Sequence, residues 1–487
     1  MRRNFHGRYG DAEGPPSCAG VIWRASMITV TEIVAAHRSG AITPAQSIRR
    51  CYERIRAIAD PGIFISLRDE EAAVAEAEAL SRGASNAPLF GVPVAVKDNI
   101  DVAGLPTTAA CPAFAYSPSC DAPVVAKLKV AGAIVIGKTN LDQFATGLVG
   151  TRTPYPAPRN PLRGDLIPGG SSSGSAVAVA SGIVPIALGT DTAGSGRLPA
   201  MYNNIVGLKP SLGLVSTRGV VPACRSLDCV SIFALTVEDA WTALSSIAGY
   251  DAADAYSRVR PLGRLELQPP GRRLGAPRTG QRFFLGDERA ASDFDEALAR
   301  LAEMGHAITE IDMAPFYETA RLLYEGPWLA ERYIVVRRIM ENDPAALHPI
   351  TRQIIAPGVA LRTTEAFEAF YRLEALRKLV AEAFADIDAL VCPTAPTACT
   401  IAQVLADPIG LNSRLGTYTN FANLLDLCGV AVPAALHRDA TPFGITIFAP
   451  AAADALAASI ARQLQAGAGL RPGAQVRNDI ESKTTTN

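Results

Sequence analysis

The chain lacks three features that would assign it to a specialised class: an excess of one charge, a long apolar run and paired cysteines. Lysine and arginine together number 46 against 47 aspartates and glutamates, so the composition shows no electrostatic footprint for nucleic acid or a membrane surface. The longest apolar candidate, Ala176–Leu188, is broken by Ser181, Gly182 and Pro185 and does not reach membrane-spanning length. These absences favour an ordinary globular enzyme without nucleic-acid or membrane partners.

Neither the cysteines nor the two ends of the chain carry a strong structural or targeting signal. The nine cysteines are scattered, odd in number and without a C-x-x-C pair, which predicts reduced thiols of a cytoplasmic protein and neither a disulfide framework nor a zinc site. Residues 1–26 lack periodicity and the apolar core of a signal peptide, so we expect a disordered extension or a start codon set upstream of Met27. Residues 471–487 are polar and predict a loose tail.

Between these ends, residues 27–470 alternate apolar strand patterns with helical patterns, and no clear linker or internal repeat divides them. Because 48% of the 487 residues are hydrophobic, the chain can bury a large core. The alternation predicts an α/β fold whose central sheet is covered by helices on both faces. Strands are expected at 92–96, 133–136, 184–188, 205–208, 308–311, 389–391 and 443–448, and helices at 43–59, 69–82, 122–131, after Ser171, and at 293–304, 316–341, 364–386 and 452–466.

Two local patterns satisfy well-known motifs but sit in the wrong context. Gly132–Thr139 (GAIVIGKT) fits the Walker A expression, yet its Ala-Ile-Val-Ile centre is typical of a buried strand and not of a phosphate-binding loop. Gly170–Gly174 (GSSSG) fits the nucleophile elbow of α/β-hydrolases, which would make Ser172 the nucleophile. That motif requires a preceding strand, whereas a loop leads into this one, and none of the five histidines has a motif-like context.

Two serines and one lysine form the most informative pattern in the chain. Ser171 lies in PGGSSSG, Ser195 follows twenty-four residues later in GTDTAGSGR, and Lys97 ends the apolar run GVPVAVKD. A serine hydroxyl needs a base to become a nucleophile, a buried lysine can be neutral enough to serve, and a second serine can relay the proton. GGSSSG alone would indicate only a flexible turn that caps a helix; the lysine and the second serine favour catalysis.

This Ser–Ser–Lys pattern resembles the amidase signature family over about residues 30–465. The resemblance implies a large mixed sheet and places the amidase signature domain at residues 27–470. It implies that Ser195 attacks an amide carbonyl to form an acyl-enzyme, and that Ser171, preceded by an unusual cis peptide bond, relays the proton. Lys97 is then the neutral base. The competing interpretation of Lys97 is an ion pair with Asp98 or another carboxylate.

The residues around the two serines have supporting roles in this interpretation. The small residues before Ser195 allow the backbone N–H groups of Thr192, Ala193, Gly194 and Ser195 to converge on an oxyanion. Asp191 and Arg197 flank this turn and are expected to fix it by hydrogen bonds, and Gly170 belongs to the turn before Ser171. Ser172 and Ser173 are expected to cap the helix that follows. The mechanism calls for no metal and no cofactor.

Two further stretches depart from the general family and resemble its allophanate hydrolase branch. The chain has AGSGR where GGSIR is usual, and SIFALTVEDA where an ending like GPLARSVEDA is usual; DPGIFIS and LLYEGPWLAERY also match that branch. LLYEGPWLAERY contains Tyr324 and Arg332, eight residues apart on a helical pattern. The resemblance implies that they hold the substrate carboxylate, a task suited to a guanidinium fork. Alternatively, Arg332 pairs with Glu331 or Glu325 on the helix surface.

The resemblance implies hydrolysis of allophanate (urea-1-carboxylate), a small anionic amide, to N-carboxycarbamate and ammonia. Alternatives are an amidase for other small amides, an amidotransferase subunit that delivers ammonia to a partner, and a non-catalytic scaffold, which the intact serines and lysine disfavour. We also expect a homodimer, and the resemblance is compatible with association with other enzymes of the same nitrogen pathway (urea or s-triazine breakdown). Allophanate hydrolases often carry a smaller C-terminal domain, for which we expect no room here.

Overall fold

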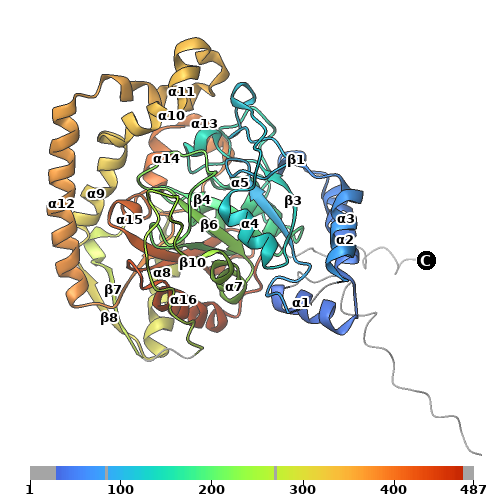
Figure 1. The fold of residues 1–487 in the computed structure, drawn as a ribbon. Coiled ribbons are helices and arrows are strands. Elements are labelled where there is room, and N and C mark those ends of the chain that lie inside the picture. Colours follow the sequence, from blue (N-terminus) through green and yellow to red (C-terminus); the bar gives the residue numbers. More distant parts are fainter. Residues whose placement is uncertain (1–28, 83–85, 268–270, 475–487) are drawn as a thin grey trace, which may run out of the picture. The chain divides into compact units, whose positions relative to one another are not determined.

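The computed structural model describes residues 29–82, 86–267 and 271–474, all within one compact unit that spans residues 28–475 (Figure 1). The expected extension 1–26 and residues 475–487 of the expected tail lie outside the described residues. Residues 471–474 are bound to the fold, since the Ala474 N–H donates to the Ala180 carbonyl at 2.9 Å and Asn204 Nδ2 donates to the Arg471 carbonyl at 2.8 Å. The ordered chain therefore continues past residue 470.

The described strands form one eleven-stranded mixed sheet, which confirms the predicted α/β class. Parallel pairs join β2 to β3 and β4, and β7 to β8 and β9, while all other neighbours are antiparallel. The spatial order is β1 (Phe64–Leu67), β3 (Ile134–Thr139), β2 (Pro93–Lys97), β4 (Ile186–Asp191), β6 (Cys229–Ala234), β5 (Val206–Lys209), β10 (Leu427–Leu436), β11 (Pro442–Pro450), β9 (Ala389–Pro393), β7 (Arg273–Pro277) and β8 (Ala307–Ile311).

Strands β2, β4 and β6 are buried at every position, which indicates that both faces of the sheet are covered there. None of the described helices combines the length and the apolar character needed to cross a membrane. The helices are α1 (Val30–Ser39), α2 (Pro44–Ile58), α3 (Glu70–Leu80), α4 (Pro123–Val130), α5 (Ser173–Ala180), α6 (Leu198–Tyr202), α7 (Val237–Ile247), α8 (Glu288–Glu303), α9 (Ala314–Glu325), α10 (Trp328–Asn342), α11 (Pro349–Ile355), α12 (Thr363–Ala385), α13 (Ile401–Ala406), α14 (Gly410–Leu415), α15 (Phe421–Leu424) and α16 (Asp454–Ala468).

Local sequence signals explain where several of these elements begin and end. Thr43 caps α2 through a capping box with Gln46, and Pro44 occupies its first turn, as the sequence predicts.

The prediction of a single helix at 316–341 is wrong: the chain forms α9 and α10, separated at Gly326 and Pro327. Proline has no N–H to donate and disfavours a helical conformation in the residue before it, so the first helix ends there.

The Walker-like stretch is a buried strand, as predicted from its apolar centre. Its last six residues, Ile134–Thr139, form the whole of β3, which is buried throughout. Lys138 lies 3.4 Å from Asp98 in a fully buried ion pair, and its Nζ also donates to the Pro106 carbonyl at 3.1 Å. The lysine is therefore engaged inside the protein and does not reach out to a phosphate.

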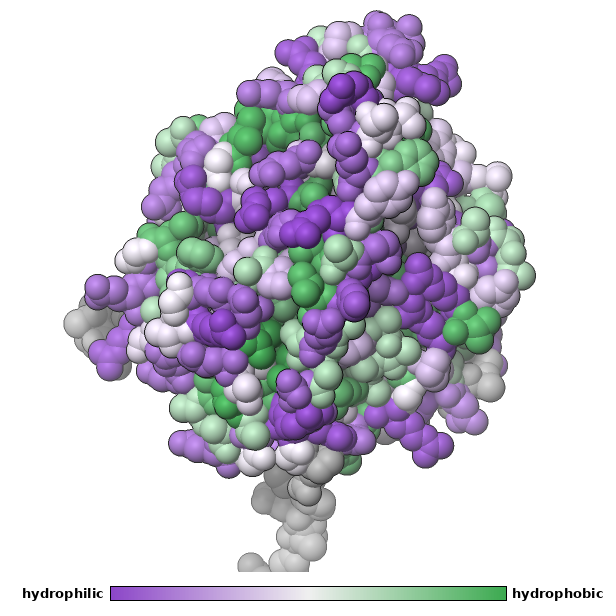
Figure 2. Space-filling view, turned by 90° about the vertical axis from the view of Figure 1, so that its left-hand side faces the viewer, coloured by the Kyte–Doolittle hydropathy of each residue, from purple (hydrophilic) through white to green (hydrophobic). Residues whose placement is uncertain are grey.

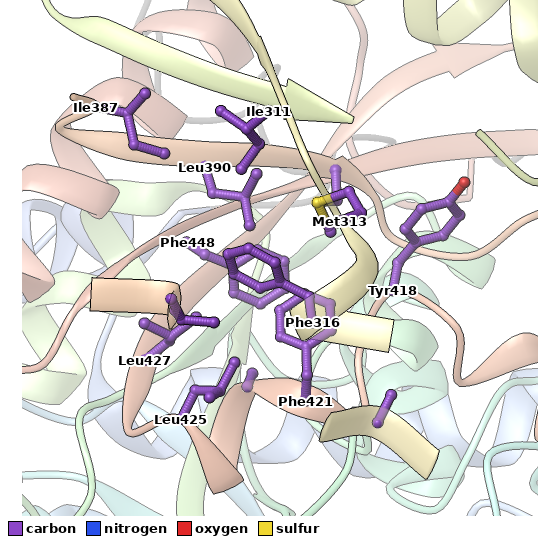
Figure 3. Packing of buried hydrophobic residues seen from close by; sticks show 14 residues of the cluster. Ile311, Met313, Phe316, Ile387, Leu390, Tyr418, Phe421, Leu425, Leu427 and Phe448 are labelled. Atoms are coloured by element: carbon purple, nitrogen blue, oxygen red, sulfur yellow. The ribbon is translucent and has the colours of Figure 1, made fainter. Parts of the chain in front are cut away.

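An aromatic cluster packs helices α9 and α15 onto the sheet (Figure 3). Phe421 of α15 lies between Phe316 of α9 and Phe448 of β11, with ring centroids 5.4 and 5.2 Å away. Burying such rings supplies a large share of core stability. The cluster anchors α9 through Phe316, and Tyr324 lies in the last turn of the same helix.

On the side of the protein that carries α12, hydrophobic and hydrophilic residues are interspersed (Figure 2).

Candidate active site

The site forms where two parallel neighbouring strands end at the same edge of the sheet. Strand β2 ends at Lys97 and β4 ends at Asp191, with Val96 beside Leu188 in the parallel register. Ser171 lies two residues before the start of α5, and this helix packs against both strands. The sheet edge thus gathers residues that are far apart in the sequence, which is typical of ligand sites in α/β folds.

Lys97 is fully buried and bound to two hydroxyl groups. Its Nζ lies 2.8 Å from Ser171 Oγ and 2.8 Å from Thr190 Oγ1. Burial lowers the pKa of Lys97 to about 7, although the negative charges of Asp142, Asp228 and Asp191 act in the opposite direction. Asp98 pairs with Lys138 and not with Lys97, so the geometry favours the base over the ion-pair alternative.

Ser171 is held by a loop of residues 142–152 as well as by Lys97. The peptide bond between Gly170 and Ser171 is cis, as the family resemblance implies. The Ser171 carbonyl accepts the Asp142 N–H at 3.0 Å, and the Gly170 N–H donates to the Leu148 carbonyl at 2.8 Å. A Cβ at Gly170 would lie 2.5 Å from the Gly150 nitrogen, so only glycine fits at this position.

The predicted roles of Asp191 and Arg197 agree with the hydrogen bonds of the turn that carries Ser195. The Asp191 carboxylate accepts the N–H groups of Gly194 at 2.9 Å and Gly196 at 3.0 Å. Arg197 binds the same carboxylate through Nε at 2.8 Å and Nη2 at 2.9 Å. Burial opposes ionisation of Asp191, but the Arg197 guanidinium and these hydrogen bonds hold its pKa below the usual value. The charged pair therefore fixes the conformation of the turn.

Ser195 is almost completely buried. Among the described residues its hydroxyl has no hydrogen-bond partner, and the same holds for the N–H groups of Thr192, Ala193 and Ser195. The Gly194 N–H is occupied by Asp191, which narrows the expected oxyanion donors to the other three. Lys97 and Ser171 are in direct contact, whereas within the described chain no hydrogen bond joins Ser171 to Ser195.

The expected helix-capping roles of Ser172 and Ser173 are wrong. Ser172 occupies the N-cap position of α5 but makes no side-chain cap hydrogen bond. Its hydroxyl instead donates to the Thr190 carbonyl at 3.2 Å, and the Ser173 hydroxyl donates to the Asn140 carbonyl at 3.4 Å. A neighbouring strand and loop compete successfully for both groups. Because Ser172 follows a loop and binds a backbone carbonyl, the nucleophile-elbow interpretation gains no support.

Asp228 is a site residue that the sequence interpretation missed. It directly precedes β6, and its carboxylate accepts the Thr192 hydroxyl and the Ala223 N–H, the latter at 2.8 Å. Burial raises the pKa of Asp228 to about 6, against the effect of these hydrogen bonds and of Arg332. The only sequence signal is an acidic residue in the otherwise apolar stretch LDCVSIFA. Asp228 ties the start of the Ser195 turn to the loop before β6.

The structure brings Tyr324 and Arg332 together across the break between α9 and α10. The Arg332 Cζ atom lies 5.4 Å from the centroid of the Tyr324 ring, a cation–π arrangement. Arg332 is 1% exposed, its Nη1 donates to Thr146 Oγ1 at 3.1 Å, and its Nε has no partner. Glu331 instead accepts the N–H and hydroxyl of Ser226, both at 2.7 Å. No carboxylate of the described residues forms an ion pair with Arg332.

The described residues contain no cluster of three or more histidine, cysteine or acidic side chains suited to a metal ion. The eight cysteines that the structure describes are all free thiols, and all except Cys120 are buried.

A family profile described as "Amidase" matches residues 46–457. The chain belongs to the amidase family. This confirms the resemblance drawn from Lys97, Ser171 and Ser195, and with it the expectation of a mixed-sheet amidase fold. The amidase is 48% identical over 363 residues to the urea amidolyase of Lachancea kluyveri, a match that covers 74% of this chain and 20% of the relative. The chain thus spans about a fifth of the length of that curated relative.

The chain is also similar to a solved allophanate hydrolase structure and to an amidotransferase subunit. The structure of Kluyveromyces lactis allophanate hydrolase superposes with a TM-score of 0.87 at 40% identity, covering 93% of this amidase and 76% of that chain. A glutamyl-tRNA(Gln) amidotransferase subunit of Oleidesulfovibrio alaskensis is 33% identical over 488 residues, covering 92% of this chain and 99% of the relative.

Proposed function

We propose that this amidase hydrolyses allophanate to N-carboxycarbamate and ammonia. The observation that carries the proposal is the buried Arg332, whose guanidinium lacks a carboxylate partner among the described residues and faces Tyr324. A buried guanidinium that forms no ion pair within 4.0 Å is costly, and Asp228 and Glu331 act on Arg332 only from a distance, raising its pKa. By contrast, the equally buried Arg197 has Asp191 as its partner. Arg332 is therefore suited to an anionic ligand, and the similarity to allophanate hydrolase favours the anion allophanate as that ligand.

The chemistry begins with Lys97 in its neutral form. As Ser195 Oγ attacks the amide carbonyl carbon, its proton passes to Ser171, whose own proton passes to Lys97 Nζ. The carbonyl π electrons move to oxygen, which the N–H groups of Thr192, Ala193 and Ser195 can stabilise. A single donor of this kind is commonly worth about 10²–10³ in rate.

The tetrahedral intermediate then collapses, and the bond between the attacked carbon and the amide nitrogen breaks. Lys97 returns the proton through Ser171 to the departing NH₂ group, which leaves as ammonia, and the acyl group remains on Ser195. Water attacks this acyl-enzyme and gives a proton to Lys97 through the same relay; the bond between Ser195 Oγ and the acyl carbon then breaks, and the relay returns the proton to Ser195 Oγ. The product is N-carboxycarbamate, which can lose carbon dioxide without the enzyme.

A substrate panel tests the proposal. Ammonia release is measured with allophanate, malonamate, propionamide and glutamine at equal concentration. Malonamate and propionamide form a matched pair that differs by the carboxylate. We expect allophanate to react fastest and malonamate to exceed propionamide by at least about tenfold, as a charge-assisted contact to a buried anion requires. Faster turnover of propionamide than of malonamate would overturn the proposal.

Similarity over nearly the whole length of an amidotransferase subunit supports a second candidate, a glutaminase that delivers ammonia to a partner. Ammonia release from glutamine that depends on an added partner protein would favour this second candidate.

The proposal also includes a homodimer, association with other enzymes of nitrogen metabolism and a cytoplasmic location. Size-exclusion chromatography with light scattering tests the dimer directly.

A further inference from the structure

We propose that Thr146 is a positioning residue that orients Arg332 toward the substrate carboxylate. The inference rests on the proposed function and adds to it a residue outside the Tyr–Arg pair. Thr146 is 1% exposed, and its Oγ1 is 3.1 Å from Arg332 Nη1. This hydrogen bond joins residues 186 positions apart in the sequence.

The Thr146 hydroxyl is set as an acceptor for Arg332. Its own proton is donated to the Phe144 carbonyl at 3.2 Å, which leaves the oxygen lone pairs for the guanidinium. The Thr146 carbonyl accepts Arg152 Nη1 at 3.0 Å, and Arg152 Nη2 donates to the Pro408 carbonyl at 2.6 Å. The hydroxyl and the backbone carbonyl of Thr146 are therefore both fixed by hydrogen bonds.

The contact with Thr146 determines which edge of the guanidinium remains available. A guanidinium has five N–H donors in a plane, and Nε and one Nη form an edge that binds a carboxylate through two parallel hydrogen bonds. Thr146 binds Nη1, while Nε is buried without a partner. The Nε and Nη2 edge is thus left for a ligand, and the Tyr324 ring lies against the guanidinium.

The loop that carries Thr146 also holds the relay serine. Asp142 closes the loop by accepting the N–H groups of Gly150 and Arg152, both at 2.9 Å. The Asp142 N–H donates to the Ser171 carbonyl at 3.0 Å. One hydrogen-bonded loop thus binds both Ser171 and Arg332, and Thr146 makes its hydrogen bond to the arginine.

The test compares Thr146→Val, which keeps the volume but removes the acceptor, with Thr146→Ser, which keeps the hydroxyl. The readout is kcat/KM for malonamate divided by kcat/KM for propionamide. We expect valine to lower this ratio at least about tenfold, mainly through KM for malonamate, and serine to restore it to within about threefold of the parent. Thr146→Ala gives the same readout if the valine variant does not fold.

The matched control is Thr351→Val in α11, because Thr351 is fully buried and its hydroxyl has no partner. The inference is overturned if Thr146→Val leaves the ratio unchanged or lowers both substrates equally, or if serine fails to restore it. Arg332→Ala separates the two claims. If Arg332→Ala removes the preference for malonamate and Thr146→Val does not, only the inference about Thr146 fails. If Arg332→Ala keeps the preference, the proposed function fails as well.

Discussion

Lys97 Nζ lies 2.8 Å from Ser171 Oγ at the end of a buried strand, while the adjacent Asp98 pairs with Lys138. Without a carboxylate in contact, desolvation dominates and lowers the pKa of Lys97 to about 7. A lysine poised in this way can accept a proton at neutral pH, whereas one paired with a carboxylate would remain an ammonium. The pairing of Asp98 with Lys138 therefore keeps Lys97 available as a base.

The pH dependence of activity follows from this pKa. Protonated Lys97 cannot accept the proton of Ser171, so kcat/KM should rise about tenfold per pH unit below the pKa and level off above about 7. The measurement is a pH–rate profile of ammonia release between pH 5 and 9. A flat profile, or one that falls between pH 6 and 8, would contradict a neutral lysine base.

The nucleophile assignment predicts which serine variants lose activity. Ser195→Ala should abolish ammonia release with little loss of stability, since the Ser195 hydroxyl has no hydrogen-bond partner among the described residues. Ser171→Ala and Lys97→Ala should each lower kcat at least about a thousandfold, and the double variant should be no worse because the two act as one relay. Activity retained in Ser195→Ala but lost in Ser172→Ala would revive the nucleophile-elbow interpretation.

The sequence predicts those parts of the site that short-range patterns encode. Lys97 follows an apolar run and Ser171 and Ser195 lie in glycine-rich turns, so each can be recognised from its neighbours in the chain. Thr43 and Pro44 likewise place the start of α2. The predicted strands do not include β10. Pro433 lies within this strand, and its ladder with β11 shifts register between Pro433 and Ala435.

The missed residues act through contacts that no local pattern records. Thr192 meets Asp228 across 36 positions, and Arg332 meets Thr146 across 186. The failed capping prediction for Ser172 has the same cause, since the Thr190 carbonyl lies 18 positions away and takes its hydroxyl. Tertiary contacts override local preference where polar side chains are buried, because a buried polar group left without a hydrogen bond is costly.

The buried pair of Asp191 and Arg197 predicts a stability effect as well as a catalytic one. Asp191→Asn removes the counter-charge of Arg197 and should lower the free energy of unfolding by about 3–5 kcal/mol. The pKa of Asp191 is lowered by folding, so the stability that this pair contributes is present above the unfolded pKa and is lost as pH falls through the folded pKa. Urea denaturation at pH 7 measures the loss.

The exposed pair of Glu318 and Arg372, in contact at 2.6 Å, supplies the control for Asp191→Asn. Glu318→Gln should lower the free energy of unfolding by less than about 1 kcal/mol, because solvent screens surface ion pairs. Equal losses in the two variants would mean that burial does not strengthen the Asp191–Arg197 pair. Unchanged kcat in a folded Asp191→Asn variant would show that the pair does not orient the Ser195 turn.

Arg332 and Tyr324 give the prediction that bears most directly on substrate. Arg332→Ala should lower kcat/KM for allophanate at least about a hundredfold, because the substrate carboxylate loses a charge-assisted contact in a buried site. Tyr324→Phe should lower kcat/KM for allophanate by a smaller factor, because the phenyl ring can still lie against the guanidinium. In the parent protein Arg332 Cζ lies 5.4 Å from the centroid of the Tyr324 ring. Steady-state kinetics with allophanate and with propionamide measure both effects.

The control for Arg332→Ala must separate lost charge from lost volume. Arg332→Met fills much of the same space without the charge, so it should show the same loss for allophanate if the guanidinium binds the carboxylate. The loss should be at least about tenfold larger for allophanate than for propionamide. If Arg332→Ala and Arg332→Met depress both substrates equally, Arg332 serves only the fold. Its buried charge would then need another partner, and the case for a carboxylated substrate would lose its physical support.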